Sequence, residues 1–396
     1  MKTKNYLLIV GILISSFVYS QRGTTIPGSF TVGGTMRTYT IYVPKIYDSL
    51  NIPVPLVFNV HGLSGTCDKQ TTAEDFRKIA DTANFILVLP QGLSTSTFGV
   101  SLPGWDVWNT VAAGQPDRDF IINLLDTVES RYKINTNRVY TAGFSQGAYM
   151  SYNLGCQNSL RFAAVSSTSG SMATTYLTAC NAQHPTPVIE IHGNNDALVS
   201  YTGGSATTTA TETVVKYWVD YNHCNPVPTI DSLADVADSL TVDMSKVIHY
   251  VYTGGTKGAT VEFYKVLNGG HQIPSLAPVP TGYGIGNTNQ DFTAAKEIWR
   301  FFSKYSLDML TDISENKIEN NDVSIYPNPS NGIFTIEIKN NQSANITVYN
   351  VLGEVVFNEK ISNRSIINLG NASSGVYFYQ VGNQTSIIKS GKLIVQ

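Results

Sequence analysis

The sequence of 396 residues has little charge: only 14% of its residues are Asp, Glu, Lys or Arg, and the formal net charge is −3. Without an excess of basic residues, it lacks the electrostatic footprint of proteins that bind nucleic acids or anionic membranes. Cysteines are also few, and none lies in a CxxC pair or in a Cys/His cluster with zinc-site spacing. We therefore expect no nucleic-acid partner, no metal and no cofactor.

Long apolar runs are missing after the first twenty residues, so we expect no transmembrane segment in the mature chain. At the start, Lys2 and Lys4 precede the apolar run YLLIVGILISSF, and small residues follow at positions 18 and 20. About twelve apolar residues are too few to span a bilayer, but they fit the core of a signal peptide. We predict a signal peptide over residues 1–20 and an exported, soluble mature protein.

Export permits disulfide bonds. The four cysteines are Cys67, Cys156, Cys180 and Cys224. The most economical pairing joins Cys156 to Cys180, because it closes only a modest loop. A bond between Cys67 and Cys224 would follow by elimination. The alternative is that these two are buried free thiols.

Short apolar runs alternate with helical periodicity through residues 21–305, which we predict to form one domain. The expected strands lie at residues 56–60, 85–89, 138–141, 162–165, 188–192 and 261–266, and the expected helices at residues 72–83, 119–132, 211–221 and 292–305. Continuous apolar runs are typical of strands buried on both faces. Strands alternating with helices predict an α/β fold with a doubly wound, mostly parallel sheet. Ahead of it, residues 29–43 predict a β-hairpin that turns at Gly33 and Gly34.

The composition changes after Tyr305. Residues 306–322 contain the charged, Asn-rich stretch DISENKIENND and predict a linker. From residue 323 to 396, strand-like runs such as ITVYNV and GVYFYQV alternate with Asn, Gly and Ser. This spacing predicts a small C-terminal all-β sandwich.

The pentapeptide GFSQG, centred on Ser145, is a G-x-S-x-G motif. On its own it is weak, because the chain is rich in Gly and Ser. Here it follows the expected strand RVYTA and precedes the expected helix AYMSYNL. A sharp strand-to-helix turn would expose the Ser145 hydroxyl at the carboxyl edge of the sheet, as in an α/β-hydrolase. This placement predicts that Ser145 is a nucleophile, which needs a neighbouring base.

The base should be a histidine that follows the serine in the chain, as the order of an α/β-hydrolase triad requires. His249 lies in the alternating run VIHYVY and is typical of a strand side chain, and His223 lies beside Cys224 at a helix end. His271 follows NGG directly after the strand VEFYKV, in a loop that could place it over Ser145. We predict that His271 is the base.

Asp196 follows a buried strand in the loop GNND and is predicted to orient His271. The tetrahedral intermediate also needs backbone donors for its oxyanion. We expect these to be the amides of Leu63, in the loop after LVFNVHG, and of Gln146. For His61, bracing of this oxyanion loop is favoured over service as a second base.

Two tryptophans, Trp105 and Trp108, lie in a loop without helical periodicity. Together with His61 they are candidates for substrate binding, because an aromatic pair beside the site could stack on a sugar, a phenolic acid or a polymer surface. The alternative is that one or both tryptophans fill the core.

The segment from Gly33 to Tyr305 resembles the polyhydroxybutyrate-depolymerase-like esterases, a family that includes feruloyl and acetylxylan esterases. The resemblance rests on RTYTIYVP, PLVFNVHG, RVYTAGFSQGAYMSY, IEIHGNNDALVSY and NGGH. It implies the triad Ser145, Asp196 and His271. The family usually has Trp-Pro after its histidine and a G-T-x-D acid loop, where this sequence has HQIP and GNND. The first difference implies an altered pocket wall.

The C-terminal segment resembles the sorting domain of type IX secretion cargo, through YPNPSNGIF, VYNVLGEVV, SSGVYFYQV and GKLIVQ. This resemblance implies that the partner of the tail is outer-membrane secretion machinery. It also implies a secreted, extracellular or surface-attached protein. From the residues alone, a carbohydrate-binding accessory is the alternative.

These features predict a secreted serine ester hydrolase that works through an acyl-enzyme on polyhydroxyalkanoate, feruloyl or acetyl esters. One alternative is a non-catalytic surface-binding or adhesion protein on a hydrolase scaffold, which would leave Ser145 unlabelled by a fluorophosphonate. The other is a serine peptidase, because the same triad cleaves amides. Comparing rates on matched esters and amides separates the two activities.

Overall fold

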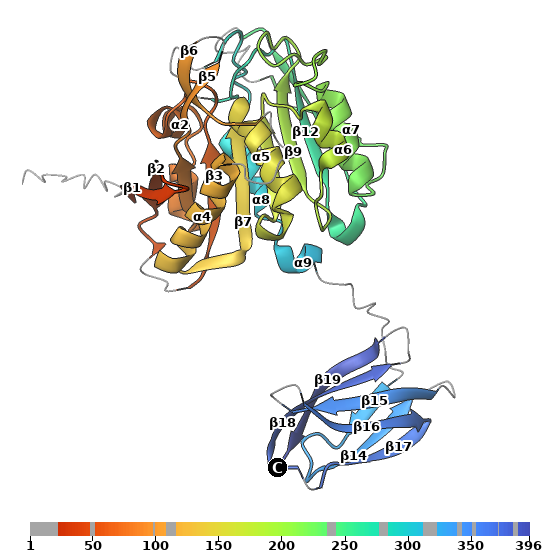
Figure 1. Cartoon of the computed structure of the whole chain (residues 1–396). Coiled ribbons are helices and arrows are strands. Elements are labelled where there is room, and N and C mark those ends of the chain that lie inside the picture. The colour runs from red at the N-terminus through yellow and green to blue at the C-terminus, as the bar shows by residue number, and fades with distance from the viewer. Residues whose placement is uncertain are drawn as a thin grey trace, which may run out of the picture. The chain divides into compact units, whose positions relative to one another are not determined.

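The structure is a computed structural model that describes residues 23–47, 52–97, 100–107, 116–235, 243–276, 284–311, 323–338, 343–350, 354–370, 372–382 and 387–396. The chain divides into two compact units, the first ending at Thr311 and the second running from Asp312 to Gln396 (Figure 1). The predicted signal peptide lies outside the described residues.

A ten-stranded sheet forms the centre of the first unit, in the order β1-β2-β4-β3-β7-β8-β9-β12-β11-β10. All neighbours from β4 to β12 are parallel, and antiparallel pairs flank them on both sides. The strands are β1 (Thr24–Val32), β2 (Thr35–Val43), β3 (Val54–Val60), β4 (Ile86–Pro90), β7 (Ile134–Phe144), β8 (Ala164–Thr168), β9 (Val188–Gly193), β10 (Thr229–Ser232), β11 (Lys246–Tyr252) and β12 (Val261–Leu267). A separate antiparallel pair joins β5 (Leu93–Thr97) to β6 (Val100–Gly104). The predicted doubly wound, mostly parallel sheet is confirmed.

Helices cover both faces of this sheet (Figure 1). They are α2 (Cys67–Ala73), α3 (Arg77–Ala83), α4 (Pro116–Arg131), α5 (Gln146–Gln157), α6 (Thr174–Ala179), α7 (Thr211–Tyr221), α8 (Ala294–Phe302) and α9 (Leu307–Thr311). On β3, Val57 packs with the cluster of α2, α3 and α8, whereas Leu56 and Phe58 pack with α4 and α5. Successive side chains of a strand point to opposite faces. Every residue of β3 is therefore buried, which explains its continuous apolar run.

The predicted N-terminal hairpin is present, with β1 and β2 paired antiparallel through a two-residue turn. Its turn residues Gly33 and Gly34 have φ angles of 56° and 81°. Positive φ at both central positions is the geometry that matches the twist of the flanking strands, and glycine adopts it without steric cost.

The helix predicted over residues 72–83 is wrong, because the chain forms two short helices there. α2 ends at Ala73, and Glu74 takes a non-helical conformation with φ −129° and ψ 76°. The Glu74 side chain is only 2% exposed and accepts a hydrogen bond of 3.2 Å from Gln70 Nε2. Burial raises the pKa of Glu74 to about 8. The chain thus leaves the helical conformation at a residue whose side chain is buried, and sequence periodicity does not record that burial.

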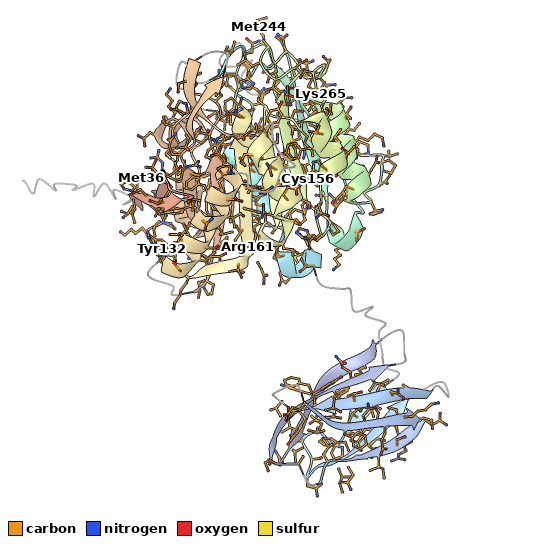
Figure 2. The ribbon with its side chains drawn as sticks, in the orientation of Figure 1. Met36, Tyr132, Cys156, Arg161, Met244 and Lys265 are labelled. Atoms are coloured by element: carbon orange, nitrogen blue, oxygen red, sulfur yellow. A yellow bond between two sulfur atoms is a disulfide. The ribbon has the colours of Figure 1, made fainter. Side chains whose placement is uncertain are left out.

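The predicted disulfide Cys156–Cys180 is present. It joins α5 to the end of α6 (Cys156 is labelled in Figure 2). Cys67 and Cys224 are buried free thiols, so the second pairing reached by elimination is wrong. The physical reason is that the two lie in different core clusters, Cys67 with α2 and α3, and Cys224 with α7.

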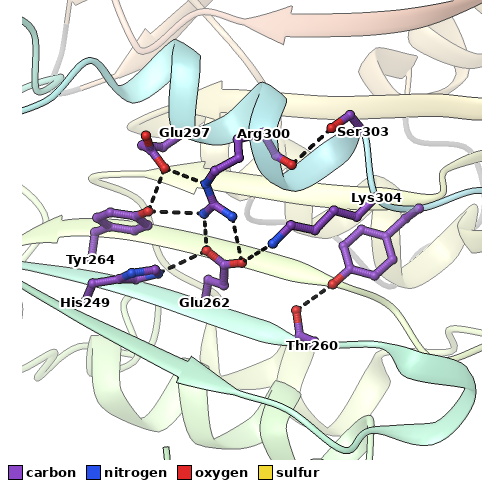
Figure 3. A network of polar contacts seen from close by, with 9 residues as sticks. His249, Thr260, Glu262, Tyr264, Glu297, Arg300, Ser303 and Lys304 are labelled. Atoms are coloured by element: carbon purple, nitrogen blue, oxygen red, sulfur yellow. Dashed lines mark hydrogen bonds and ion pairs between the residues drawn. The ribbon is translucent and has the colours of Figure 1, made fainter. Parts of the chain in front are cut away.

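Helix α8 is fastened to the sheet by a buried carboxylate (Figure 3). Glu262 of β12 is 2% exposed and pairs with Arg300, with Lys304 at 2.9 Å and with His249 Nε2 at 3.0 Å. Burial raises the pKa of Glu262, but hydrogen bonds from His249 and Arg300 outweigh it and lower the pKa to about 2. His249 is thus a strand side chain of β11, as predicted.

The second unit consists of two antiparallel sheets, in the orders β13-β14-β17 and β16-β15-β18-β19. Its strands are β13 (Val323–Tyr326), β14 (Ile333–Ile338), β15 (Ser343–Tyr349), β16 (Val355–Ser362), β17 (Arg364–Asn368), β18 (Gly375–Gly382) and β19 (Ile387–Val395). Residues from both sheets form one buried cluster, so the unit is an all-β sandwich. Where a linker is predicted from residue 306, α9 continues the first unit, because Leu307 and Leu310 are buried against its core.

Candidate active site

Three loops carry the residues predicted for catalysis. They follow β7, β9 and β12, which lie within the parallel part of the sheet (Figure 1). Parallel strands end at the same edge, so side chains distant in the sequence can meet there. The loop after β3, the neighbour of β7, reaches this edge as well.

The loop after β7 is a sharp turn at Ser145, whose φ and ψ are 54° and −122°. A side chain at Gly143 would place Cβ 2.2 Å from the Gly147 oxygen, and one at Gly147 would place Cβ 2.1 Å from the Val60 oxygen. Only glycine fits at either position. The Ser145 amide donates to Thr168 O at 2.9 Å, which ties the turn to the end of β8. A strained residue of this kind costs about 1–3 kcal/mol and persists only when its surroundings hold it in place.

His271 and Asp196 are brought together at this edge. The Nδ1 atom of His271 lies 2.7 Å from Asp196 Oδ2, and the two residues are 3% and 8% exposed. The other carboxylate oxygen, Oδ1, accepts the amides of Leu198 and Val199 at 2.8 Å each. Burial raises the pKa of Asp196, but hydrogen bonds from His192 and His271 outweigh it and hold the pKa below the usual range. The carboxyl is therefore ionised at neutral pH.

Backbone hydrogen bonds join the loop of Asp196 to the loop of His271. The Asn194 amide donates to Val266 O at 2.9 Å, and the Asn195 amide donates to Gly269 O at 2.9 Å. In the reverse direction, the Asn268 amide donates to the side-chain oxygen of Asn194 at 2.7 Å. These bonds fix the two loops relative to each other and so set the spacing between carboxylate and imidazole.

His271 also lies beside the turn that carries Ser145. Its ring centroid is 4.9 Å from that of Phe144, the residue before the serine. The residue after the histidine, Gln272, accepts a hydrogen bond of 3.1 Å from Ser169 Oγ, at the end of β8. Direct contacts thus connect the turn at Ser145 to the imidazole of His271, and the imidazole to the carboxylate of Asp196.

The loop predicted to hold the oxyanion, residues 61–65 after β3 and called the oxyanion loop below, approaches the serine closely. A Cβ added at Gly62 would lie 3.1 Å from Ser145 Cβ. Across the part of the chain that the structure describes, neither the Leu63 nor the Gln146 backbone amide donates a hydrogen bond to a protein acceptor. These two amides remain available for an oxyanion.

His61 braces the oxyanion loop. Its side chain is fully buried; Nε2 accepts the Gly92 amide at 2.9 Å and Nδ1 lies 2.7 Å from Gly62 O. A ring that accepts at Nε2 and donates at Nδ1 is neutral. Burial lowers the pKa of His61 to about 4, in agreement with this assignment.

Two of the three substrate-binding predictions must be corrected. Trp105 is 1% exposed; its Nε1 donates to His61 O at 2.7 Å and its amide donates to Gln146 Oε1 at 2.9 Å. The tryptophan ring packs on His61, with centroids 4.9 Å apart. Both side chains are therefore buried against the oxyanion loop, and neither has a ring surface exposed to contact a substrate. Trp108 lies outside the described residues.

Sequence reasoning missed a polar pair under the acid loop, Glu190 and His192 of β9, which are 1% and 0% exposed. The sequence of β9 does contain a signal for this pair. The strand VIEIHG carries two polar side chains two residues apart, and such residues share one face of the strand. In a strand buried on both faces, that pattern indicates an internal polar network.

Two regions of the chain match known protein families. Residues 54–242 match a family described as Phospholipase/Carboxylesterase, and residues 324–396 match a family described as Secretion system C-terminal sorting domain. The chain thus combines an α/β-hydrolase region with a sorting domain, and both resemblances seen in the sequence are confirmed.

Individual relatives are esterases. A bifunctional acetylxylan esterase/xylanase of Neocallimastix patriciarum is 26% identical over 76% of this chain and 37% of its own length. A probable feruloyl esterase C of Aspergillus niger is 28% identical over 48% of this chain and 63% of its own length. The chain therefore spans less than two thirds of either protein. Feruloyl esterase D of Neurospora crassa is 26% identical over 69% of this chain and 84% of its own length.

Solved structures of the same kind are also similar. An acetyl xylan esterase from Aspergillus awamori has 15% identity and a TM-score of 0.48, covering 70% of this chain and 99% of that protein. A ferulic acid esterase from Anaeromyces mucronatus has 16% identity and a TM-score of 0.45, covering 73% of this chain and 92% of that protein.

Proposed function

We propose that this chain, a carboxylesterase-family α/β-hydrolase with a secretion sorting domain, is a secreted serine esterase that forms an acyl-enzyme on Ser145. The observation that carries the proposal is the 2.7 Å contact between His271 Nδ1 and Asp196 Oδ2, at the edge of the sheet where Ser145 occupies a strained turn. A carboxylate that accepts at Nδ1 keeps Nε2 of the imidazole free to accept a proton.

In the first half-reaction, Ser145 Oγ attacks the ester carbonyl carbon and passes its proton to His271 Nε2. Asp196 stabilises the imidazolium that results. The amides of Leu63 and Gln146 donate to the oxyanion of the tetrahedral intermediate. When this intermediate collapses, the carbon–alcohol oxygen bond breaks, His271 returns the proton to the alcohol, and the acyl group remains on Ser145.

In the second half-reaction, a water molecule replaces the alcohol. His271 removes a proton from the water, which attacks the acyl carbon through the same oxyanion site. When this second tetrahedral intermediate collapses, the bond between the acyl carbon and Ser145 Oγ breaks, and His271 returns its proton to Oγ. The products are a carboxylic acid and the free serine. No further group is consumed in either half.

The substrate class that we propose is an acetyl or feruloyl ester carried on a plant polysaccharide. The support comes from the names of the relatives, which include acetylxylan esterase and feruloyl esterases. The sorting domain supports export, through outer-membrane secretion machinery, to the medium or the cell surface. In the described residues, no helix is both long and apolar enough to cross a membrane.

The test compares hydrolysis of p-nitrophenyl acetate by the wild type and by Ser145→Ala, with Ser303→Ala as a matched change at an exposed serine of α8's end. We expect kcat to fall by roughly four to six orders of magnitude in the first variant only. Activity retained in Ser145→Ala would contradict the proposal. A panel of acetylated xylan, methyl ferulate and polyhydroxybutyrate film then ranks the substrates, and a matched p-nitroanilide measures any amidase activity.

A further inference from the structure

The proposed triad rests on a second, fully buried imidazole. We propose that His192 is a positioning residue, an imidazolium held between Glu190 and Asp196 that fixes the carboxylate of the triad and sets how readily His271 accepts a proton. This inference deepens the proposed function and rests on it for its catalytic meaning.

The contacts of the His192 ring define its protonation. Its Nε2 atom lies 3.0 Å from Val199 O and 3.4 Å from Asp196 Oδ2, and its Nδ1 atom lies 3.2 Å from Glu190 Oε1. A carbonyl and a carboxylate can only accept hydrogen bonds, so Nε2 must carry a hydrogen. Because Nδ1 meets a carboxyl group, the Glu190–His192 pair holds one further proton between the two residues.

The surroundings favour that proton on the imidazole. Burial raises the pKa of Glu190. Tyr152 opposes this effect, because its hydroxyl donates to Glu190 Oε2 at 2.6 Å and such a hydrogen bond stabilises the charged carboxylate. Burial lowers the pKa of His192, but hydrogen bonds to Asp196 and Glu190 outweigh it and raise the pKa to about 10. The result is a buried cation with an anion on each side.

Other elements packed on His192 bring one further ion pair. From α5, Tyr152 donates to Glu190, and Tyr149 interacts electrostatically with Glu190 and Asp196; burial raises the pKa of both phenols. Tyr201 packs edge-on with its ring centroid 6.0 Å from that of His192. On β12, the sheet partner of His192 is Lys265, whose Nζ pairs with Glu212 of α7 at 2.8 Å. Glu212 neutralises the charge of Lys265, so Glu190 and Asp196 are the anions that face the His192 imidazole.

Asp196 Oδ2 therefore lies between two imidazoles, His192 on one side and His271 on the other. The cation at His192 competes for the same oxygen and disfavours a second positive charge on His271. Removing that charge should strengthen the attraction between Asp196 and the imidazolium that forms at His271 in the reaction. Asp196 Oδ2 would also lose its contact with His192, one of the two imidazoles that fix the orientation of the carboxylate.

His192→Gln tests this, because the glutamine amide can still donate to Val199 O and Asp196 but carries no charge. The matched control is His249→Gln, which removes another histidine from a buried carboxylate, Glu262, two strands away on the opposite face of the sheet. The two readouts are the pH profile of kcat/KM on p-nitrophenyl acetate, and the far-downfield proton resonance of the Asp196–His271 hydrogen bond across the same pH range.

We expect the acid limb of the His192→Gln profile to move up by about one pH unit. At a pH below that limb kcat/KM is then about tenfold lower, while the plateau is unchanged. The downfield resonance should shift at a correspondingly higher pH, and His249→Gln should leave both readouts in place. An unchanged acid limb and an unchanged resonance in folded His192→Gln would overturn the proposal, as would an equal loss of rate at every pH.

The two proposals fail in different ways. If the wild type hydrolyses no ester, the proposed function fails, while the resonance still reports on the coupling between His192 and the Asp196–His271 pair.

If His192→Gln does not fold, Glu190→Gln is the second variant. We expect the nitrogen resonances of His192 to show a fully protonated ring through pH 8 in the wild type and to titrate at lower pH in Glu190→Gln. A neutral His192 in the wild type would overturn the inference.

Discussion

Replacing Asp196 with Asn changes only one atom, and the structure predicts a large effect. The Oδ1 atom of Asp196 accepts two backbone amides, from Leu198 and Val199 at 2.8 Å each. The side-chain oxygen of an asparagine must take that place, because an NH₂ group cannot accept from two donors. The NH₂ group then occupies the position of Oδ2 and donates to His271 Nδ1. Consequently the imidazole carries its hydrogen on Nε2, the nitrogen that accepts the serine proton in the proposed reaction, and cannot act as the base.

The magnitude follows from two losses. The charge-assisted hydrogen bond that stabilises the imidazolium is worth about 1.5–3 kcal/mol, and reversal of the tautomer adds a comparable penalty. A total of about 4–5 kcal/mol corresponds to a decrease in kcat of roughly three to four orders of magnitude. The KM for a short ester should change little, since the side chain of Asp196 is fully buried.

The assay is steady-state hydrolysis of p-nitrophenyl acetate at pH 7.5, with thermal unfolding measured alongside. Asp220→Asn makes the same chemical change at an exposed ion pair of α7 and should keep kcat within about twofold. If folded Asp196→Asn retained a tenth or more of the wild-type kcat, the assignment of Asp196 as the acid would be refuted.

Further predictions concern the scaffold. Gly147→Ala should lower the melting temperature and abolish activity, because its Cβ would lie 2.1 Å from a backbone oxygen of β3. The depressed pKa of Glu262, about 2, means that its ion pairs stabilise the fold above roughly pH 4.5 and that this contribution is lost as the pH falls toward 2. Glu262→Gln should therefore cost about 3 kcal/mol at pH 7 and flatten the acid side of the stability profile, measured by urea unfolding from pH 2 to 7. Replacing both Cys156 and Cys180 with Ser should lower the free energy of unfolding by about 3 kcal/mol while leaving kcat at 25 °C near the wild-type value.

Much of the α/β core could be predicted because each helix or strand has a recognisable pattern of apolar residues in its own local sequence. Helix α7 occupies the predicted residues Thr211–Tyr221, since its apolar side chains recur at helical spacing against the sheet. The break between α2 and α3 could not be predicted in this way. It coincides with the burial of one carboxyl, Glu74, and that burial is a tertiary property.

The same distinction applies to the site. Loops that follow parallel strands end at one edge of the sheet, so the sequence could place Asp196 and His271 near each other. It could not decide whether Trp105 faces a substrate or the core, because a tryptophan in a loop is compatible with both. The structure resolves this through its bond to the backbone of His61.

The central claim is that an ester transfers its acyl group to the Ser145 hydroxyl. Intact-protein mass spectrometry of the enzyme quenched within milliseconds of mixing with p-nitrophenyl acetate tests it most directly, followed by peptide mapping of the modified protein. We expect one added acetyl group, located on Ser145, with a stoichiometric burst of p-nitrophenolate that Ser145→Ala lacks. Turnover without any acetyl group on Ser145, or an acetyl group on another residue that forms as fast as the burst, would contradict it.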